Sequence, residues 1–121
     1  MGNLVFAVDD CDMNLTVVEH ALKSRYTVYC IESIDELFTL LGQMIPEAIL
    51  LDFYMPDMTC CEVFERLKAD TFYADIPVIV MSGARATDIK DECMSMGAVH
   101  FIPKPILDPV DFLAQVKQWA K

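Results

Sequence analysis

Five short apolar runs alternate along the chain with segments in which apolar residues recur at helical spacing. Short, nearly continuous apolar runs bounded by loop signals are typical of strands buried on both faces of a parallel sheet. The pattern therefore predicts five β-strands. They lie at about Leu4–Val8, Thr27–Ile31, Ala48–Asp52, Pro77–Ser82 and Val99–Pro103.

Helical periodicity and two capping boxes predict the helices of the first half. Apolar residues at helical spacing indicate a helix over about Met13–Ser24. Ser33-x-x-Glu36 and Thr59-x-x-Glu62 are capping boxes, in which a hydroxyl and a glutamate satisfy backbone N–H groups at a helix start. Pro46 ends the pattern that follows the first of these boxes.

A glycine and a proline delimit the last two predicted helices. A helix over about Thr87–Met96 is expected to stop at Gly97, because glycine readily adopts the left-handed conformation that ends helices. Asp108 and Pro109 form an N-cap followed by proline at the first helical position. The last helix then runs towards Trp119.

Strict alternation of strand and helix predicts an α/β fold with right-handed crossovers and helices on both faces of a parallel sheet. A TIM barrel would need about 250 residues, roughly twice this length. We therefore predict one domain over residues 1–121 with a doubly wound, five-stranded parallel sheet. Its expected strand order is the flavodoxin-like 2-1-3-4-5.

The chain is strongly acidic, with a formal net charge of -10 and a pI of about 4.3. Such a field repels nucleic acid phosphates, so we expect no direct binding of nucleic acid. It also suits a site that concentrates a divalent cation.

Neither a membrane segment nor a disulfide framework is predicted. No apolar run approaches the roughly 20 residues that span a bilayer, and no basic stretch precedes an apolar one at the amino terminus. We therefore expect a cytoplasmic location without membrane insertion. The five cysteines form no C-x-x-C pair, which favours reduced structural thiols over a disulfide framework or a zinc site.

Charged side chains follow the ends of three predicted strands. Asp9-Asp10 closes the first apolar run, Asp52 closes the third and Lys104 follows the fifth. Because parallel strands end at one edge of the sheet, these groups are expected to converge near the switch point between strands one and three. Taken alone, Asp9-Asp10 could merely cap the first helix.

A cluster of carboxylates needs a cation or a shared proton. Two carboxylates about 4 Å apart repel each other by about 4 kcal/mol even at an effective dielectric constant of about 20. Oxygen-only ligand sets suit Mg²⁺, which usually takes one or two carboxylates together with phosphate oxygens. Asp52 is then a candidate nucleophile towards a phosphoryl group. Lys104 would supply a point charge for the phosphoryl oxygens and Ser82 a hydroxyl donor.

Four stretches, in order and at characteristic spacing, identify a family resemblance. They are Val8-Asp9-Asp10, the run from Leu50 to Met58 that contains Asp52 and Pro56, Ile79-Val80-Met81-Ser82-Gly83-Ala84, and Gly97-Ala98-x-x-Phe101-Ile102-Pro103-Lys104-Pro105. With them the chain resembles the receiver domain of two-component response regulators over essentially its whole length. It is similar both to free-standing, chemotaxis-type receivers and to receivers that form part of larger regulators.

The resemblance implies a phosphoacceptor switch in which Asp52 takes phosphate from a histidine kinase or a histidine phosphotransfer protein. It implies Mg²⁺, for which Mn²⁺ can substitute, and Ser82 and Lys104 as the groups that hold the phosphoryl oxygens. Phe101 matches the aromatic switch of the family. The implied metal ligands are Asp9, Asp10, Asp52 and the backbone carbonyl of Tyr54.

The resemblance further implies a phosphorylation-linked shift of the surface formed by strand four, helix four, strand five and helix five. It implies a cis Lys104–Pro105 bond and a domain that accepts its phosphoryl group and slowly releases it without being an enzyme in the usual sense. Tyr54 and Ala84 occupy the two positions that tune phosphoryl lifetime in the family. Cys60 stands where receivers commonly carry glycine, so either φ stays negative there or the turn is altered.

Partners are implied in the same way. Docking of the phosphodonor protein is expected through Met13, Leu15, Val18 and Ile106. A downstream output protein or domain is expected as the second partner, and a phosphorylation-linked homodimer stays open.

Three other functions are weighed against this one. An aspartate-nucleophile phosphohydrolase typically has a second acid two residues after its nucleophile, where this chain has Tyr54. A flavodoxin-type nucleotide binder is disfavoured because no glycine-rich loop follows the first strand. A degenerate receiver that binds proteins constitutively stays open, although the intact acids argue against it.

Overall fold

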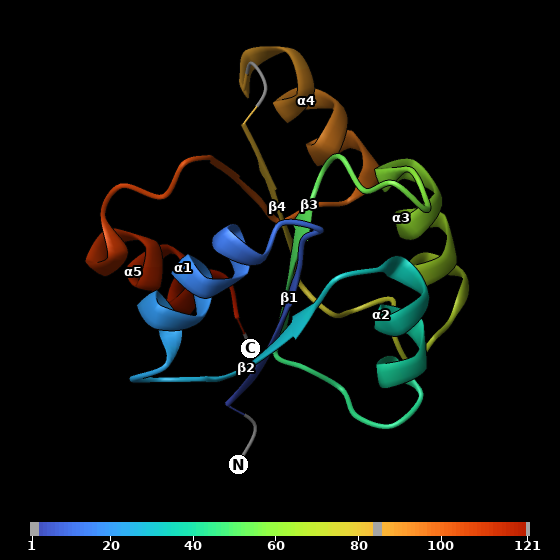
Figure 1. Cartoon of the computed structure of the whole chain (residues 1–121). Coiled ribbons are helices and arrows are strands. Elements are labelled where there is room, and N and C mark those ends of the chain that lie inside the picture. The colour runs from blue at the N-terminus through green and yellow to red at the C-terminus, as the bar shows by residue number, and fades with distance from the viewer. Residues whose placement is uncertain (1–2, 84–85, 121) are drawn as a thin grey trace.

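The computed structural model describes residues 3–83 and 86–120. Its strands are β1 (Leu4–Val8), β2 (Thr27–Ile31), β3 (Ala48–Asp52), β4 (Val78–Ser82) and β5 (His100–Pro103). Its helices are α1 (Asp12–Leu22), α2 (Ile34–Leu41), α3 (Cys60–Ala69), α4 (Ala86–Met96) and α5 (Pro109–Trp119). The predicted alternation of strands and helices is confirmed (Figure 1).

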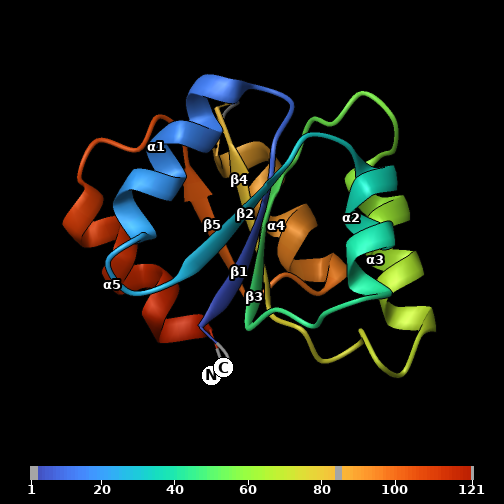
Figure 2. The ribbon, with the colours of Figure 1, turned by 60° about the horizontal axis from the view of Figure 1, so that its bottom comes forward.

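All five strands pair in parallel in the order β2-β1-β3-β4-β5, as predicted. The sheet separates two layers of helices, with α1 and α5 on one face and α2, α3 and α4 on the other (Figure 2). Side chains alternate between the two cores along each strand: Phe6 and Val8 join the cluster under α2–α4, whereas Val5 and Ala7 join the cluster under α1 and α5. This two-sided burial explains why the strands are almost uninterrupted apolar runs.

The capping residues act as predicted at most helix starts. Thr59 and Glu62 form a complete capping box at α3, and Asp108 accepts the N–H groups of Val110 and Asp111 at α5. At α2 the box is altered: Ser33 accepts the N–H of Glu36, but the Glu36 carboxylate accepts the N–H of Glu32 and not that of Ser33.

The turn predictions are confirmed where the structure describes them. Gly97 ends α4 with φ of 117°, and the Lys104–Pro105 bond is cis. Outside glycine, no described residue has a positive φ, so Cys60 begins α3 with ordinary backbone geometry. Helix α1 ends at Leu22, two residues before the predicted Ser24. No helix among the described residues is both long enough and apolar enough to span a bilayer.

Candidate functional site

The sheet brings the predicted polar residues to one edge. Strand β3 lies between β1 and β4, and β5 follows β4, so the carboxyl ends of these four strands adjoin one another. Asp9 follows β1, Asp52 is the last residue of β3, Ser82 is the last of β4 and Lys104 follows β5. The predicted convergence of these side chains is therefore a direct consequence of the strand order.

Three carboxylates form the centre of the site. One oxygen each of Asp9, Asp10 and Asp52 lies within 4.8 Å of the other two. Asp9 and Asp52 are buried, at 1% and 6% exposure, whereas Asp10 is exposed. The cluster has the oxygen-only ligand set that magnesium prefers, and it opens into a cleft of about 540 Å³.

Lys104 binds both buried acids. Its Nζ lies 2.9 Å from Asp9 Oδ2 and 3.2 Å from Asp52 Oδ1, and its side chain is 14% exposed. Its backbone N–H donates to the carbonyl of Ser82 at 2.8 Å. Asp9 Oδ1 accepts the N–H of Cys11 at 3.0 Å, so both oxygens of this carboxylate are hydrogen-bonded. Asp9 thus bonds Lys104 and the residue just before α1, but no side-chain hydrogen bond caps the start of that helix.

Burial sets the protonation behaviour of the site. Desolvation, followed by the charge of Asp9, raises the pKa of Asp52 above its ordinary value of 3.8, although Lys104 and the backbone N–H of Tyr54 partly oppose this rise. Burial alone would lower the pKa of Lys104, but its bonds to Asp9 and Asp52 outweigh burial and raise it. The cluster thus holds three carboxyl groups and one ammonium, which contacts two of them, and a divalent cation would neutralise the remaining negative charge.

Ser82 and Phe101 are buried, as Asp9 and Asp52 are. Ser82 is fully buried at the end of β4, beside the backbone of Lys104. Phe101 is 5% exposed and belongs to the core cluster under α2, α3 and α4. Phe101 is thus a core residue in this conformation, which is compatible with the predicted switch role because a switch aromatic is buried in one of its states.

Tyr54 and Ala84 are the two positions predicted to tune the phosphoryl lifetime. Tyr54 is 58% exposed and lines the cleft above the acids, with its ring edge-on to Phe53 at a centroid distance of 4.8 Å. Ala84 lies outside the described residues.

The predicted docking surface needs a correction. Leu15 and Val18 are buried, at 4% and 1% exposure, in the core between α1, α5 and the sheet. Leu15 therefore has almost no surface to offer a partner, and Val18 is one of the residues that line a small cavity of about 150 Å³. Met13 is 76% exposed and Ile106 is half-buried, so these two predicted residues do lie at the surface.

Sequence reasoning missed the exposed apolar residues next to Met13 and Ile106. Val17, one turn after Met13, is 38% exposed, and Leu107 and Val110 are 86% and 78% exposed. A signal existed for Val17, because residues four apart share a helix face. Leu107 is in a loop and has no such periodicity.

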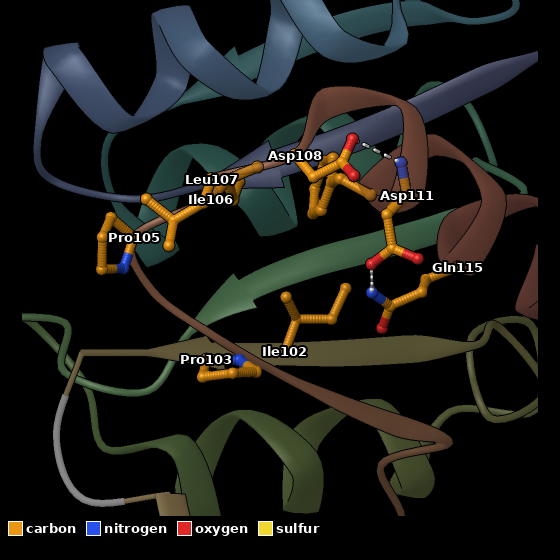
Figure 3. Close-up of a pocket in the computed structure, with 9 residues that line it drawn as sticks. Ile102, Pro103, Pro105, Ile106, Leu107, Asp108, Asp111 and Gln115 are labelled. Atoms are coloured by element: carbon orange, nitrogen blue, oxygen red, sulfur yellow. Dashed lines mark hydrogen bonds between the residues drawn. The ribbon is translucent and has the colours of Figure 1, made fainter.

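A groove adjoins this apolar surface between β5, α5 and the loop that joins them (Figure 3). Its volume is about 190 Å³, and its apolar wall includes Ile102, Pro105 and Ile106. Its polar wall is internally bonded: Asp108 accepts the N–H of Asp111 at 3.1 Å, and Asp111 accepts the amide of Gln115 at 2.7 Å.

Comparison with known proteins agrees with this geometry. The family model of the response regulator receiver domain matches residues 5–117. The two-component response regulator ORR6 of Oryza sativa subsp. japonica is 33% identical over 106 residues, which cover 84% of this chain and 62% of that protein. ORR5 of the same subspecies is 31% identical over 104 residues, covering 84% of this chain and 78% of that protein.

Solved structures share the fold at lower sequence identity. The chemotaxis response regulator CheY4 of Vibrio cholerae superposes with a TM-score of 0.87 at 24% identity, covering 98% of both chains. The receiver domain of the sensor histidine kinase PA1611 from Pseudomonas aeruginosa superposes with a TM-score of 0.85 at 20% identity, covering 98% of both chains. That receiver domain holds a magnesium ion in its active-site cleft.

Proposed function

Because the chain belongs to the response regulator receiver domain family, the phosphoacceptor signalling domain of two-component systems, we propose that Asp52 accepts the phosphoryl group. The observation that carries this assignment is that Asp52, at the end of β3, is buried beside a second acid and shares the ammonium of Lys104 with it. Lys104 Nζ is 3.2 Å from Asp52 Oδ1 and 2.9 Å from Asp9 Oδ2. Asp9 shares the burial, the neighbouring ammonium and the two further acids. Asp52 is assigned as the acceptor because it ends β3, within the Leu50–Met58 stretch that resembles the family.

Magnesium fits this site by the chemistry of its donors. Three carboxylates have oxygens within 4.8 Å of one another, and their combined negative charge exceeds the single positive charge of Lys104. Among the described residues, no cation contacts the exposed Asp10. We assign the metal to Asp9, Asp10, Asp52 and the backbone carbonyl of Tyr54. When bound, it would neutralise negative charge on the phosphoryl oxygens and on the carboxylates. Mn²⁺ is expected to substitute.

Phosphoryl transfer then follows from the charges of the chain itself. A carboxylate oxygen of Asp52 attacks the phosphorus of a phosphohistidine on the donor protein. The P–N bond breaks, and its electron pair stays on the imidazole nitrogen. Lys104 transfers its hydrogen bond from Asp52 to a phosphoryl oxygen, and the Ser82 hydroxyl donates to another. Such transfer depends on position and charge neutralisation more than on acid–base chemistry.

We infer that these new bonds shift a conformational equilibrium. Bonds from Ser82 and Lys104 to the phosphoryl oxygens would favour one arrangement of the β4–α4 connection and of Phe101, and so alter the surface of α4, β5 and α5. Moving an equilibrium from 1:99 to 99:1 needs about 5.5 kcal/mol of differential interaction. Two charge-assisted hydrogen bonds at about 1.5–3 kcal/mol each are of that size. An output protein or domain, or a second copy, would then bind the altered surface.

The test of this function is the transfer of one phosphoryl group to Asp52 from a small-molecule phosphodonor in the presence of Mg²⁺. An adduct on another residue, or one that forms equally without the metal, would contradict it.

Tyr54 is expected to slow the loss of the phosphoryl group. Tyr54 is exposed and lines the same cleft as Asp52, and we expect its ring to cover one approach for water. Tyr54→Asn replaces the ring with a small polar group and should shorten the phosphoryl half-life about tenfold, a barrier change of about 1.4 kcal/mol. Decay of the phosphorylated chain, followed by intact mass, measures this. Tyr54→Phe keeps the ring and serves as the matched control, with an unchanged half-life. An unchanged half-life in Tyr54→Asn would rule out shielding.

Docking of the phosphodonor protein is proposed for the exposed apolar side chains of α1 and the β5–α5 loop, chiefly Met13, Ile106 and Leu107. Truncating Met13 and Leu107 to alanine should slow transfer from a phosphorylated histidine phosphotransfer protein about thirtyfold. Burial of each side chain on contact contributes about 1 kcal/mol, so the two together contribute about 2 kcal/mol. Transfer from a small-molecule donor should be unaffected, since the site itself is intact. Phe72→Ala, at an exposed position near the opposite end of the sheet, is the matched control. Equal rates for the double variant and the wild type would exclude this surface.

A further inference from the structure

The loop that follows the acceptor is tied to a helix distant in sequence. Asp57 lies five residues after Asp52, in the connection between β3 and α3. Its Oδ2 accepts the backbone N–H of Ile34 at 2.8 Å and, more weakly, that of Asp35 at 3.4 Å. These are the first two residues of α2, and 23 positions separate Ile34 from Asp57.

Helix α2 needs this external acceptor. The first four N–H groups of a helix have no partner within it. At α2, the Ser33 hydroxyl accepts the N–H of Glu36, and the Ser33 carbonyl accepts the N–H of Leu37. The N–H groups of Ile34 and Asp35 point instead to Asp57, whose negative charge also suits the positive end of the helix dipole. The contact is therefore a helix cap supplied by a loop from elsewhere in the chain.

The same contact holds the middle of the β3–α3 loop. At one end, the N–H of Phe53 donates to the carbonyl of Met81 at 2.9 Å. At the other end, Thr59 is fixed by its capping box with Glu62. Between these anchors lie Tyr54, whose carbonyl we assign to the metal, and Asp57, whose carboxylate is bonded to α2.

The contact also joins two of the segments that carry proposed metal ligands. The N–H of Asp9 donates to the carbonyl of Ile31 at the end of β2, at 3.0 Å. Two residues separate Ile31 from Ile34, which donates to Asp57. A closed path thus runs from Asp9 through the β2–α2 turn to Asp57 and back along the loop to Asp52.

We propose that Asp57 is a positioning residue for the metal site: its bonds to α2 hold the β3–α3 loop so that the carbonyl of Tyr54 faces the carboxylates. The role rests on the proposed function, because it assumes that Mg²⁺ binds Asp9, Asp10, Asp52 and that carbonyl. Asp57 itself contacts neither metal nor phosphate in this scheme. It acts through the loop backbone.

Mg²⁺ titration of the full chain by calorimetry tests the proposal with three variants. Asp57→Ala should raise the Kd for Mg²⁺ about tenfold, the lower end of the loss seen when outer partners of metal ligands are removed. Asp57→Asn keeps an oxygen acceptor for Ile34 but removes the charge, so it should stay close to the wild type. Ser33→Ala removes a cap of the same helix without touching the loop, and should leave the Kd unchanged.

Backbone hydrogen exchange at Tyr54, measured without Mg²⁺, supplies a readout that a general loss of stability would not reproduce. Exchange should accelerate in Asp57→Ala and not in Ser33→Ala, even where both variants unfold at lower temperature than the wild type. An unchanged Kd in Asp57→Ala, or equal losses in Asp57→Ala and Ser33→Ala, would overturn the positioning role. A wild-type chain that binds no Mg²⁺ would instead overturn the proposed metal site, and the positioning role with it.

Discussion

Asp52→Asn is expected to stabilise the fold while it abolishes phosphoryl acceptance. Asp52 is 6% exposed, and burial together with Asp9 raises the pKa of its carboxyl group. The charged form is thus disfavoured in the native state, and neutral asparagine of the same shape removes that penalty, on the order of 1 kcal/mol at neutral pH. Function and stability therefore change in opposite directions at this residue.

The pH dependence of this gain has a definite sign. A carboxyl whose pKa is raised on folding contributes stability below its unfolded value, near 3.8, and loses that contribution as the pH rises through the raised value. The difference between Asp52→Asn and the wild type should therefore be small in acid and grow to its full size at neutral pH. Urea unfolding at a series of pH values without metal measures it. Asp75→Asn, at an exposed position, is the control and should stay within about 0.5 kcal/mol of the wild type.

Lys104→Met is expected to have the opposite effect on stability. It removes the ammonium that contacts Asp9 and Asp52 and leaves two buried carboxylates facing each other. Removing one partner of a buried ion pair typically costs about 3–5 kcal/mol, and we expect about 3 because the Lys104 side chain is 14% exposed. Phosphoryl acceptance should also fall strongly, since the phosphoryl oxygens lose their cation.

Magnesium should restore part of the stability that Lys104→Met loses. A ligand that binds only the native state at about ten times its Kd adds about 1.4 kcal/mol. Unfolding in Mg²⁺ and in a chelator, compared for Lys104→Met and the wild type, measures this. Lys90→Met, at an exposed position, serves as the control. Its free energy of unfolding should stay within about 0.5 kcal/mol of the wild type, both in Mg²⁺ and in the chelator. A Lys104→Met chain as stable as the control would show that the two contacts of Lys104 contribute little.

The fold could be predicted closely because its signals are local and mutually consistent. Strands buried on both faces leave uninterrupted apolar runs, and Thr59, Gly97 and Asp108 mark helix ends through bonds within a few residues. The convergence of Asp9, Asp52, Ser82 and Lys104 followed from strand order alone, because each stands at the end of a strand.

The predictions failed or fell short where one residue had two available partners or where contacts are long-range. The Glu36 carboxylate accepts the N–H of Glu32 and not that of Ser33, the partner that the capping box predicted. The sequence spacing is compatible with either partner. Leu15 and Val18 have the helical phase that faces the core, so their assignment to a docking surface conflicted with the periodicity that predicted α1. Asp57 could not be found from sequence, since its partner lies 23 positions away and no local pattern records that contact.

The location and metal dependence of phosphoryl uptake test the central claim most directly. The wild-type chain and Asp52→Asn are incubated with a small-molecule phosphodonor, in Mg²⁺ or in a chelator, and analysed by intact mass and peptide mapping. The account predicts one phosphoryl group per wild-type chain, on Asp52, only with Mg²⁺ and absent from the variant. An adduct that persists in Asp52→Asn, or one that forms equally without Mg²⁺, would contradict it.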